Sequence, residues 1–179
     1  MDIPRTQFEL PLRAGVVNGV AAYVAGLVTS TALFAFFGRT AIAEIAGSAI
    51  PRATESFAWV FYGGHGVEIV VDGTAINFTR TVASNAALYF LVPLVLLLVS
   101  GHYVASTLEE KPSYAAGFVA GGTITLGYLP LVAAGAVLFE YDVTNVTVTI
   151  PFLEAVLLAG IAYPVLVGGI GGVIATHRR

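Results

Sequence analysis

The residues best suited to chemistry lie close together in the longest polar interruption of the sequence. His65, Glu68 and Asp72 follow an aromatic stretch and a glycine-rich turn. A His-x-x-Glu spacing with a nearby Asp could supply metal ligands, but a metal site needs three or four convergent ligands. A surface histidine that is hydrogen-bonded to a turn is the favoured interpretation.

Motifs of catalysis and cofactor binding are absent from the sequence. It contains no G-x-S-x-G, H-E-x-x-H, P-loop or dinucleotide-binding fingerprint, and it contains no cysteine. Cysteine nucleophiles, thiolate metal ligands and disulfides are therefore excluded. We expect a protein that is not an enzyme, with no catalytic residue, no cofactor and no metal.

A second set of residues pairs a tyrosine with a proline in apolar segments. A proline inside a helix leaves a backbone carbonyl without its donor, and that carbonyl needs a partner in an apolar interior. Tyrosine hydroxyls could supply this partner as part of ordinary packing, which is the favoured interpretation. They could instead line a path for a small solute. The candidates for this interior are Asn18, Tyr89, Pro93, Tyr128, Pro130, Tyr163 and Pro164.

The composition is that of a membrane protein. Hydrophobic residues make up 57% of the 179 residues, and only 11% are charged. A soluble domain usually carries about 25% charged residues, so this chain has too few to cover a surface in water. The net charge of -3 also argues against nucleic-acid binding.

Four apolar segments are long enough to cross a bilayer. About 20 helical residues at roughly 1.5 Å each span a hydrocarbon core of about 30 Å. We therefore expect an all-α membrane protein that forms a single domain over residues 1–179. The predicted transmembrane helices cover 14–37, 86–107, 114–139 and 152–175.

A small extracellular cap is predicted from residues 38–85, between the first and second helices. It should contain a helix along the membrane face at 40–49, and then a short helix and a β-hairpin whose turn is Asp72-Gly73, a dipeptide suited to tight turns. The outer link 140–151 could pair with this hairpin. The aromatic segment 54–64 suits a membrane-surface anchor, and a re-entrant segment is the alternative. The possible partner-binding residues of the cap are Trp59, Phe61, Tyr62 and His65.

Positively charged residues indicate that both termini lie in the cytoplasm. Lysine and arginine are enriched in the cytoplasmic flanks of transmembrane helices. With the termini inside, the inner flanks carry five such residues and the outer segments carry three. The possible glycosylation sites Asn77 and Asn145 would then lie outside. The inner residues are Arg5, Arg13, Lys111, Arg178 and Arg179, and the outer ones are Arg39, Arg52 and Arg80.

Glycines four residues apart occur in three of the predicted helices, where they would let neighbouring helices pack closely. They favour a compact bundle and are compatible with a homo-oligomer or a membrane protein partner in the lipid bilayer. The same segments contain almost no ionisable side chains, which counts against transport driven by protons or sodium ions. The glycine pairs are Gly15 with Gly19, Gly117 with Gly121, and Gly168 with Gly172.

Several phrases of the sequence together resemble a known family. They include PLRAGVVNGVAAYVAG, WVFYGGHGVEI, LYFLVPLVLLLVSGHYVA, AGFVAGGTITLGYLPLVAAGAVLF and VLLAGIAYPVLVGGIGG. The chain resembles small haloarchaeal four-helix membrane proteins of unknown function, and the similarity spans nearly the whole chain. The resemblance implies the fold and an archaeal, halophilic habitat. It implies no substrate, cofactor or catalytic residue.

Two functions are therefore expected, in this order. The first is a non-enzymatic accessory or scaffold subunit that assembles with partners through its cap and helix faces. The second is a small-solute transporter or channel component that uses the tyrosine- and proline-lined interior. Replacing Tyr128 and Tyr163 with phenylalanine should affect only transport, and changes at Trp59 or His65 should affect only partner binding.

Overall fold

The computed structural model describes residues 9–37, 53–83, 85–108, 112–143 and 146–177. Within these ranges, four helical segments are long and apolar enough to cross a membrane. They are Leu12–Phe37, Ala86–Ser106, Tyr114–Leu138 and Phe152–His177. Each lies within a few residues of its predicted span. The helix predicted at 40–49 lies outside the described residues.

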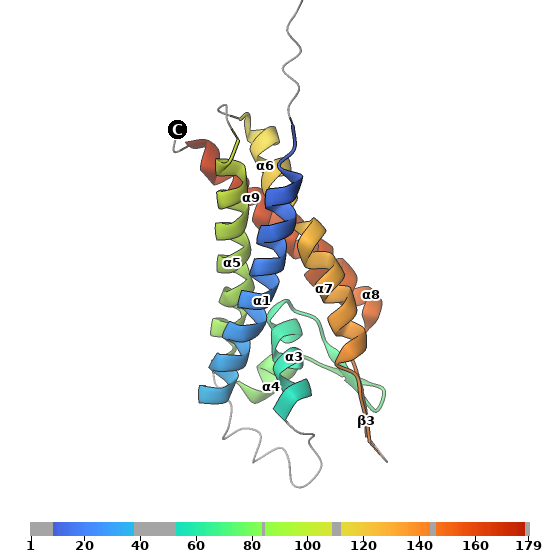
Figure 1. Cartoon of the computed structure of the whole chain (residues 1–179). Coiled ribbons are helices and arrows are strands. Elements are labelled where there is room, and N and C mark those ends of the chain that lie inside the picture. The colour runs from blue at the N-terminus through green and yellow to red at the C-terminus, as the bar shows by residue number, and fades with distance from the viewer. Residues whose placement is uncertain (1–8, 38–52, 84, 109–111, 144–145, 178–179) are drawn as a thin grey trace, which may run out of the picture.

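The first two spans are continuous helices, whereas the last two are interrupted (Figure 1). α1 covers Leu12–Phe37 and α5 covers Ala86–Ser106. The third span consists of α6 and α7, and the fourth of α8, the π-helical segment η1 and α9. The bounds of these segments are Tyr114–Gly122 for α6, Thr125–Leu138 for α7, Phe152–Glu154 for α8, Ala155–Ala162 for η1 and Tyr163–His177 for α9.

The predicted short helix and hairpin are both present between α1 and α5. They form α3 (Ala53–Gly64), β1 (Ile69–Val71) and β2 (Thr74–Ile76), and the short helix α4 (Phe78–Val82) follows. The link between α7 and α8 contributes two more strands, β3 and β4, which cover Tyr141–Val143 and Val146–Thr149. The antiparallel sheet has the order β2-β1-β4-β3, so the predicted pairing of the outer link with the hairpin is confirmed.

The hairpin turn adopts the conformation that its sequence predicts. Asp72 has a φ of 47° and Gly73 a φ of 83°, which are the two consecutive positive angles of a tight hairpin turn. Asp72 also joins the turn to the second hairpin, because its Oδ1 accepts a hydrogen bond of 3.0 Å from the backbone N–H of Thr147. The two hairpins therefore behave as one sheet.

Glycines join the helices at the end of the bundle where the chain enters α1 and leaves α9. A methyl group on Gly117 or Gly121 of α6 would collide with the backbone of α9, at Gly172 and Gly168. A methyl group on Gly19 of α1 would collide with the carbonyl of Ile124. All three predicted glycine pairs thus serve contacts between helices of the same chain.

The other end of the bundle is splayed. α7 and the α8–η1 segment diverge from α1 and α5, and α3 and α4 lie in the space between them (Figure 1). The divergence begins where the spans are interrupted, at Thr123–Ile124 and at the end of η1. Pro164 is the second residue of α9, just after η1, and lacks the N–H group that a regular α-helical turn needs.

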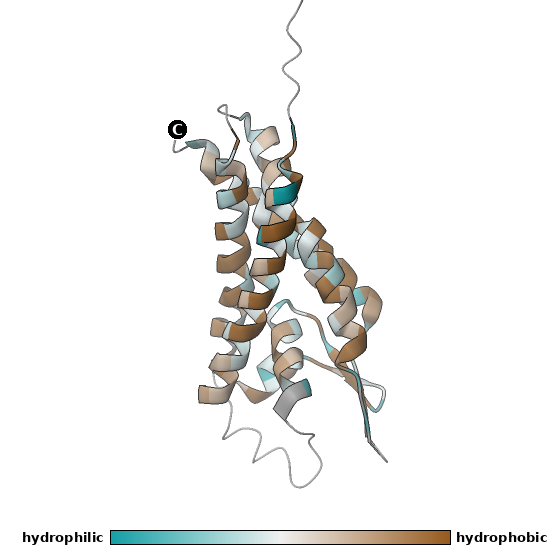
Figure 2. Cartoon of the chain, in the orientation of Figure 1, coloured by the Kyte–Doolittle hydropathy of each residue, from teal (hydrophilic) through white to brown (hydrophobic). Residues whose placement is uncertain are grey.

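The outer faces of the long helices are apolar (Figure 2). Large exposed side chains include Val17, Val28, Leu91 and Leu166, which are 50–60% exposed. A continuous apolar surface of this kind is avoided in water and suits contact with lipid. The architecture is therefore compatible with a multi-pass membrane protein, in which these faces meet acyl chains.

Substituting Gly121 with alanine should destabilise the bundle. The added methyl would meet the carbonyl of Gly168, and such overpacking costs about 1–3 kcal/mol. The neighbouring Gly122→Ala is a matched control, because its methyl would lie 3.8 Å from the nearest atom, the carbonyl oxygen of Val165. Denaturant unfolding in detergent should show a loss for Gly121→Ala only, and equal losses would contradict the close helix contact.

Candidate functional site: a histidine–tyrosine cluster at the buried end of α3

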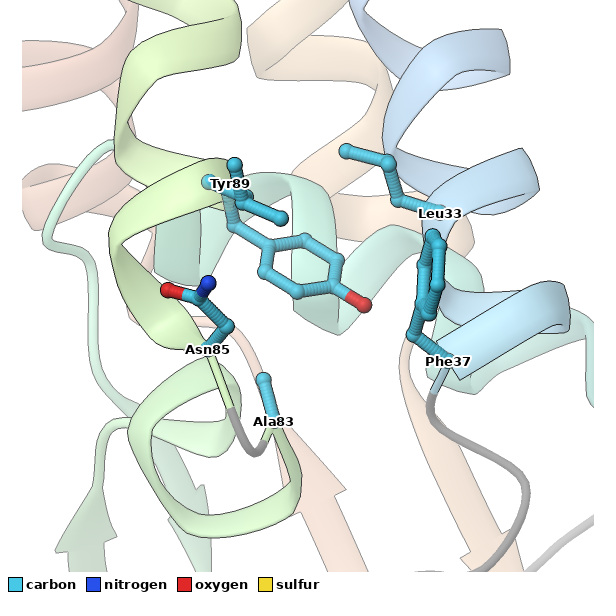
Figure 3. Close-up of a pocket in the computed structure, with 6 residues that line it drawn as sticks. Leu33, Phe37, Ala83, Asn85 and Tyr89 are labelled. Carbon is cyan, nitrogen blue, oxygen red and sulfur yellow. The ribbon is translucent and has the colours of Figure 1, made fainter.

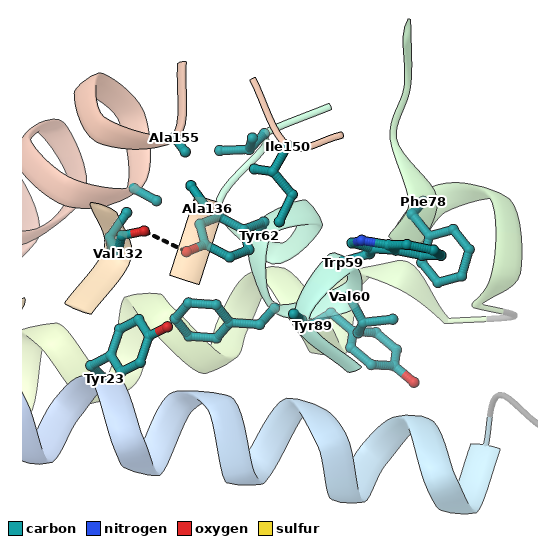
Figure 4. Packing of buried hydrophobic residues seen from close by; sticks show 14 of the residues in the cluster. Tyr23, Trp59, Val60, Tyr62, Phe78, Tyr89, Val132, Ala136, Ile150 and Ala155 are labelled. Atoms are coloured by element: carbon teal, nitrogen blue, oxygen red, sulfur yellow. Dashed lines mark hydrogen bonds between the residues drawn. The ribbon is translucent and has the colours of Figure 1, made fainter. Parts of the chain in front are cut away.

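The side chains of α3 lie inside the protein. Trp59, Val60, Phe61 and Tyr62 are each no more than 1% exposed (Figure 4). The Trp59 ring packs edge-on against Phe78 of α4, and its indole N–H donates to the carbonyl of Phe139 at 3.1 Å. α3 is therefore a buried wedge between the diverging helices.

The end of α3 is closed by a Schellman motif. Gly66 has a φ of 81°, a left-handed conformation that glycine adopts without strain. The backbone N–H of Val67 donates to the carbonyl of Tyr62 at 3.2 Å, and that of Gly66 donates to the carbonyl of Gly63 at 3.0 Å. The His-Gly-Val sequence thus pairs two carbonyls that would otherwise lack partners.

Three side chains bind further carbonyls of the same helix end. The ring of His65 donates from Nδ1 to the carbonyl of Phe61 at 2.9 Å. From α4 and its N-cap, Thr79 Oγ1 donates to Val60 at 3.0 Å and Asn77 Nδ2 donates to Gly63 at 3.3 Å. Unpaired carbonyls are costly in an apolar interior, so these bonds are a condition for burying α3.

The same histidine connects α3 to the third span. Because a carbonyl can only accept, the bond to Phe61 places a proton on Nδ1, and neutral His65 then has an accepting Nε2. The hydroxyl of Tyr128 donates to Nε2 at 2.8 Å. The ring of Tyr163 packs against His65 with a centroid distance of 5.1 Å, so the site joins α3, α7 and α9.

A second tyrosine pair lies next to this histidine. The hydroxyl of Tyr62 donates to the carbonyl of Val132 at 2.6 Å (Figure 4). The hydroxyl of Tyr23 lies close to that of Tyr62. A Cβ atom added to Gly135 would lie 2.5 Å from the hydroxyl oxygen of Tyr62 and 2.6 Å from that of Tyr23. Gly135 therefore leaves the space that the hydroxyl pair occupies.

The environment of His65 keeps its ring uncharged. Burial lowers the pKa of His65 from 6.5 to about 4, and the bond to the Phe61 carbonyl opposes this shift without reversing it. The groups around the ring are uncharged: two tyrosines, the ring of Phe61 and a backbone carbonyl. The cluster is thus a neutral hydrogen-bonded network at neutral pH.

The structure places the predicted partner-binding residues of the cap inside the protein. Trp59, Phe61, Tyr62 and His65 are almost fully buried, so none offers its side chain to a partner in this conformation. The reason is that an aromatic side chain with one polar edge suits a satisfied interior as well as a membrane surface.

The predicted interior residues divide into two groups. Tyr89, Pro93, Tyr128 and Pro164 are buried, and Tyr163 is partly buried. Pro130 is exposed on the outer face of α7, and the half-buried Asn18 donates to Ala14 of its own helix at 2.9 Å. The interior is therefore built from fewer of these residues than predicted. The hydrogen bond between His65 and Tyr128 also makes the cap and the interior a single cluster rather than two separable sites.

The structure describes one of the two predicted glycosylation sites. Asn77 is half-buried, and its side chain caps α4 by accepting from the backbone N–H of Arg80 at 3.1 Å. Its amide nitrogen also donates to Gly63, so this side chain has a structural role. Asn145 lies outside the described residues.

The carboxylates near His65 are arranged differently from a metal site. Glu68 and Asp72 are exposed, whereas His65 is buried. Among the described residues, no group of three or more histidine, aspartate or glutamate side chains could hold a metal ion. Sequence reasoning missed three residues of the cluster, which are Tyr23, Thr79 and Gly135. Each lies in an ordinary helical segment and contacts a distant part of the chain, so no local sequence pattern indicates its role.

Acid should destabilise the protein through His65. Its pKa is lower in the folded state than in the unfolded chain, so the stability from the neutral ring is full above pH 6.5 and is lost as the pH falls towards 4. The loss should be about 3 kcal/mol. His65→Gln keeps an N–H donor but cannot titrate, so its unfolding free energy should fall less over this range. Equal acid losses in the two proteins would contradict this assignment.

Comparison with known proteins identifies a family without an assigned function. The model of a family of unknown function, DUF7978, matches residues 4–179. No curated protein and no solved structure matches the chain. The family description names no source organism and no membrane, so the haloarchaeal origin stays a prediction. Because the match covers nearly the whole sequence, the chain belongs to the DUF7978 family of unknown function.

Proposed function

We propose that this protein is a non-enzymatic accessory or scaffold subunit of the membrane that binds a protein partner through its sheet. The observation that carries this proposal is the burial of α3 between the splayed helices. Its aromatic side chains fill the space between the splayed helices, and Trp59 and Tyr62 donate to the backbone carbonyls of Phe139 and Val132. A filled interior suits a rigid support better than a path for solutes.

The sheet supplies the contact surface. Among the described strands, β2 pairs only with β1, and its residues Thr74 and Ala75 are exposed. An unpaired strand edge can accept a further strand from another chain. Acidic side chains are exposed at the same sheet and its flanks, and they favour a basic partner segment. They are Glu68, Asp72, Glu140 and Asp142.

The orientation follows from the positive charges. The start of α1 and the end of α9 lie at one end of the bundle, and the sheet lies at the other (Figure 1). If the termini are cytoplasmic, as the lysine and arginine distribution favours, the sheet faces outward in the cell membrane. An acidic, lysine-poor chain of this kind suits the proposed haloarchaeal habitat. The predicted glycine pairs already form contacts between helices of this chain, so a protein partner would bind other helix faces.

Thr74→Lys should remove the partner. A lysine on a strand edge opposes further pairing, and we expect at least about a tenfold loss of co-purified partner, or about 1.4 kcal/mol. Thr107→Lys is the matched control, since Thr107 is exposed at the opposite end of the bundle. The measurement is mass spectrometry of intact particles from native membranes. Retention of the partner by Thr74→Lys would reject the β2 edge as the contact.

A small-solute transporter or channel component is the second candidate. The observation that favours it is the interruption of both spans beside the cluster, at Thr123–Ile124 and in η1. Broken and π-helical segments recur at functional sites in membrane transporters. In this case the tyrosine hydroxyls would exchange their bonds for bonds to a solute when the helices move.

Tyr163→Phe tests this second candidate with little effect on packing. It removes the hydroxyl and keeps the ring against His65, so transport through the interior should slow by about tenfold, as for one lost hydrogen bond. The rate of glycerol entry is measured by light scattering from vesicles that contain the reconstituted protein. Tyr103→Phe is the control, because Tyr103 is 59% exposed. Equal rates with and without protein, for glycerol and other small neutral solutes, would count against transport.

A further inference from the structure

A cavity lies away from the histidine–tyrosine cluster, between the last turn of α1 and the first turn of α5 (Figure 3). Its volume is about 250 Å³. Apolar side chains form most of the wall, and polar groups come only from the α5 side. The lining residues are Leu33, Phe37, Ala83, Asn85, Leu88 and Tyr89.

The hydroxyl of Tyr89 has no hydrogen-bond partner. The residue is 2% exposed, and its ring extends from α5 across the cavity towards α1 (Figure 3). A buried hydroxyl without a partner destabilises the folded state. Because Tyr89 lines the cavity, an acceptor bound there would supply the missing partner.

The start of α5 adds further donors at the same place. Asn85 is the N-cap, but its side chain makes no capping bond and is exposed. The first N–H groups of a helix have no partner within the helix, and the helix dipole makes this end partially positive. Arg80 also lies close to this turn, with its guanidinium 5.5 Å from the centre of the Phe90 ring. These groups favour an anion.

We propose that this cavity binds the phosphate headgroup of a membrane phospholipid. The phosphate oxygens would accept from the Tyr89 hydroxyl, from Asn85 and from the first turn of α5. The adjoining glycerol and chain carbons would contact Leu33 and Phe37. A lipid source fits the place, because the cavity lies where two spans end and headgroups are found. This site goes beyond the proposed function and does not depend on it.

The test uses the full-length protein purified in mild detergent and incubated with palmitoyl-oleoyl phosphatidylglycerol. Native mass spectrometry counts the lipids that each chain retains. Wild type and Tyr103→Phe, a control on the outer face of the same helix, should retain the lipid equally. Tyr89→Phe should retain about tenfold less, as expected for one hydrogen bond to a charged group. Leu88→Trp, which fills the cavity, should also lose the lipid.

Two further probes identify the source of the phosphate. Diacylglycerol with the same chains lacks the anion and should not be retained. Inorganic phosphate alone should neither raise the unfolding temperature nor displace the lipid. Equal retention by Tyr89→Phe, or equal retention of diacylglycerol, would overturn the proposal. Displacement of the lipid by inorganic phosphate would also overturn it, because the site would then serve a soluble anion.

Discussion

The buried end of α3 is the constraint on which the rest of this structure depends. A helix that ends inside an apolar bundle leaves carbonyls that no water can reach, so the chain must supply every partner. The Gly66 turn, the ring of His65 and the side chains of Thr79 and Asn77 supply them. These bonds explain why α4 and the hairpin lie where they do, since each carries or positions a donor.

The helices pack differently at the two ends of the bundle. At the end where α1 begins and α9 ends, glycines such as Gly121 and Gly168 allow the helix backbones to touch. At the sheet end the helices diverge, and the aromatic side chains of α3 occupy the volume. The interruptions at Thr123–Ile124 and before Pro164 mark the change from one mode to the other.

This arrangement separates the interior of the protein from its contact surfaces. The central histidine and tyrosines bind each other, so they hold the structure together in the conformation described. The surfaces that we propose for other molecules lie at the margins, in the edge of β2 and in the cavity beside Tyr89. A platform for a protein and a site for a lipid can coexist on such a scaffold, because they involve different elements.

The sequence by itself determined the spans, the hairpin and the absence of catalytic motifs. Span length is a local property of apolar composition, and Asp72-Gly73 specifies its turn through backbone angles alone. The burial of α3 was decided only by tertiary structure, because Trp59 and Tyr62 suit a membrane surface and an interior equally well. The partner of His65 lies 63 residues away on α7. No local pattern encodes that distance, so only the folded helices could bring the two side chains together.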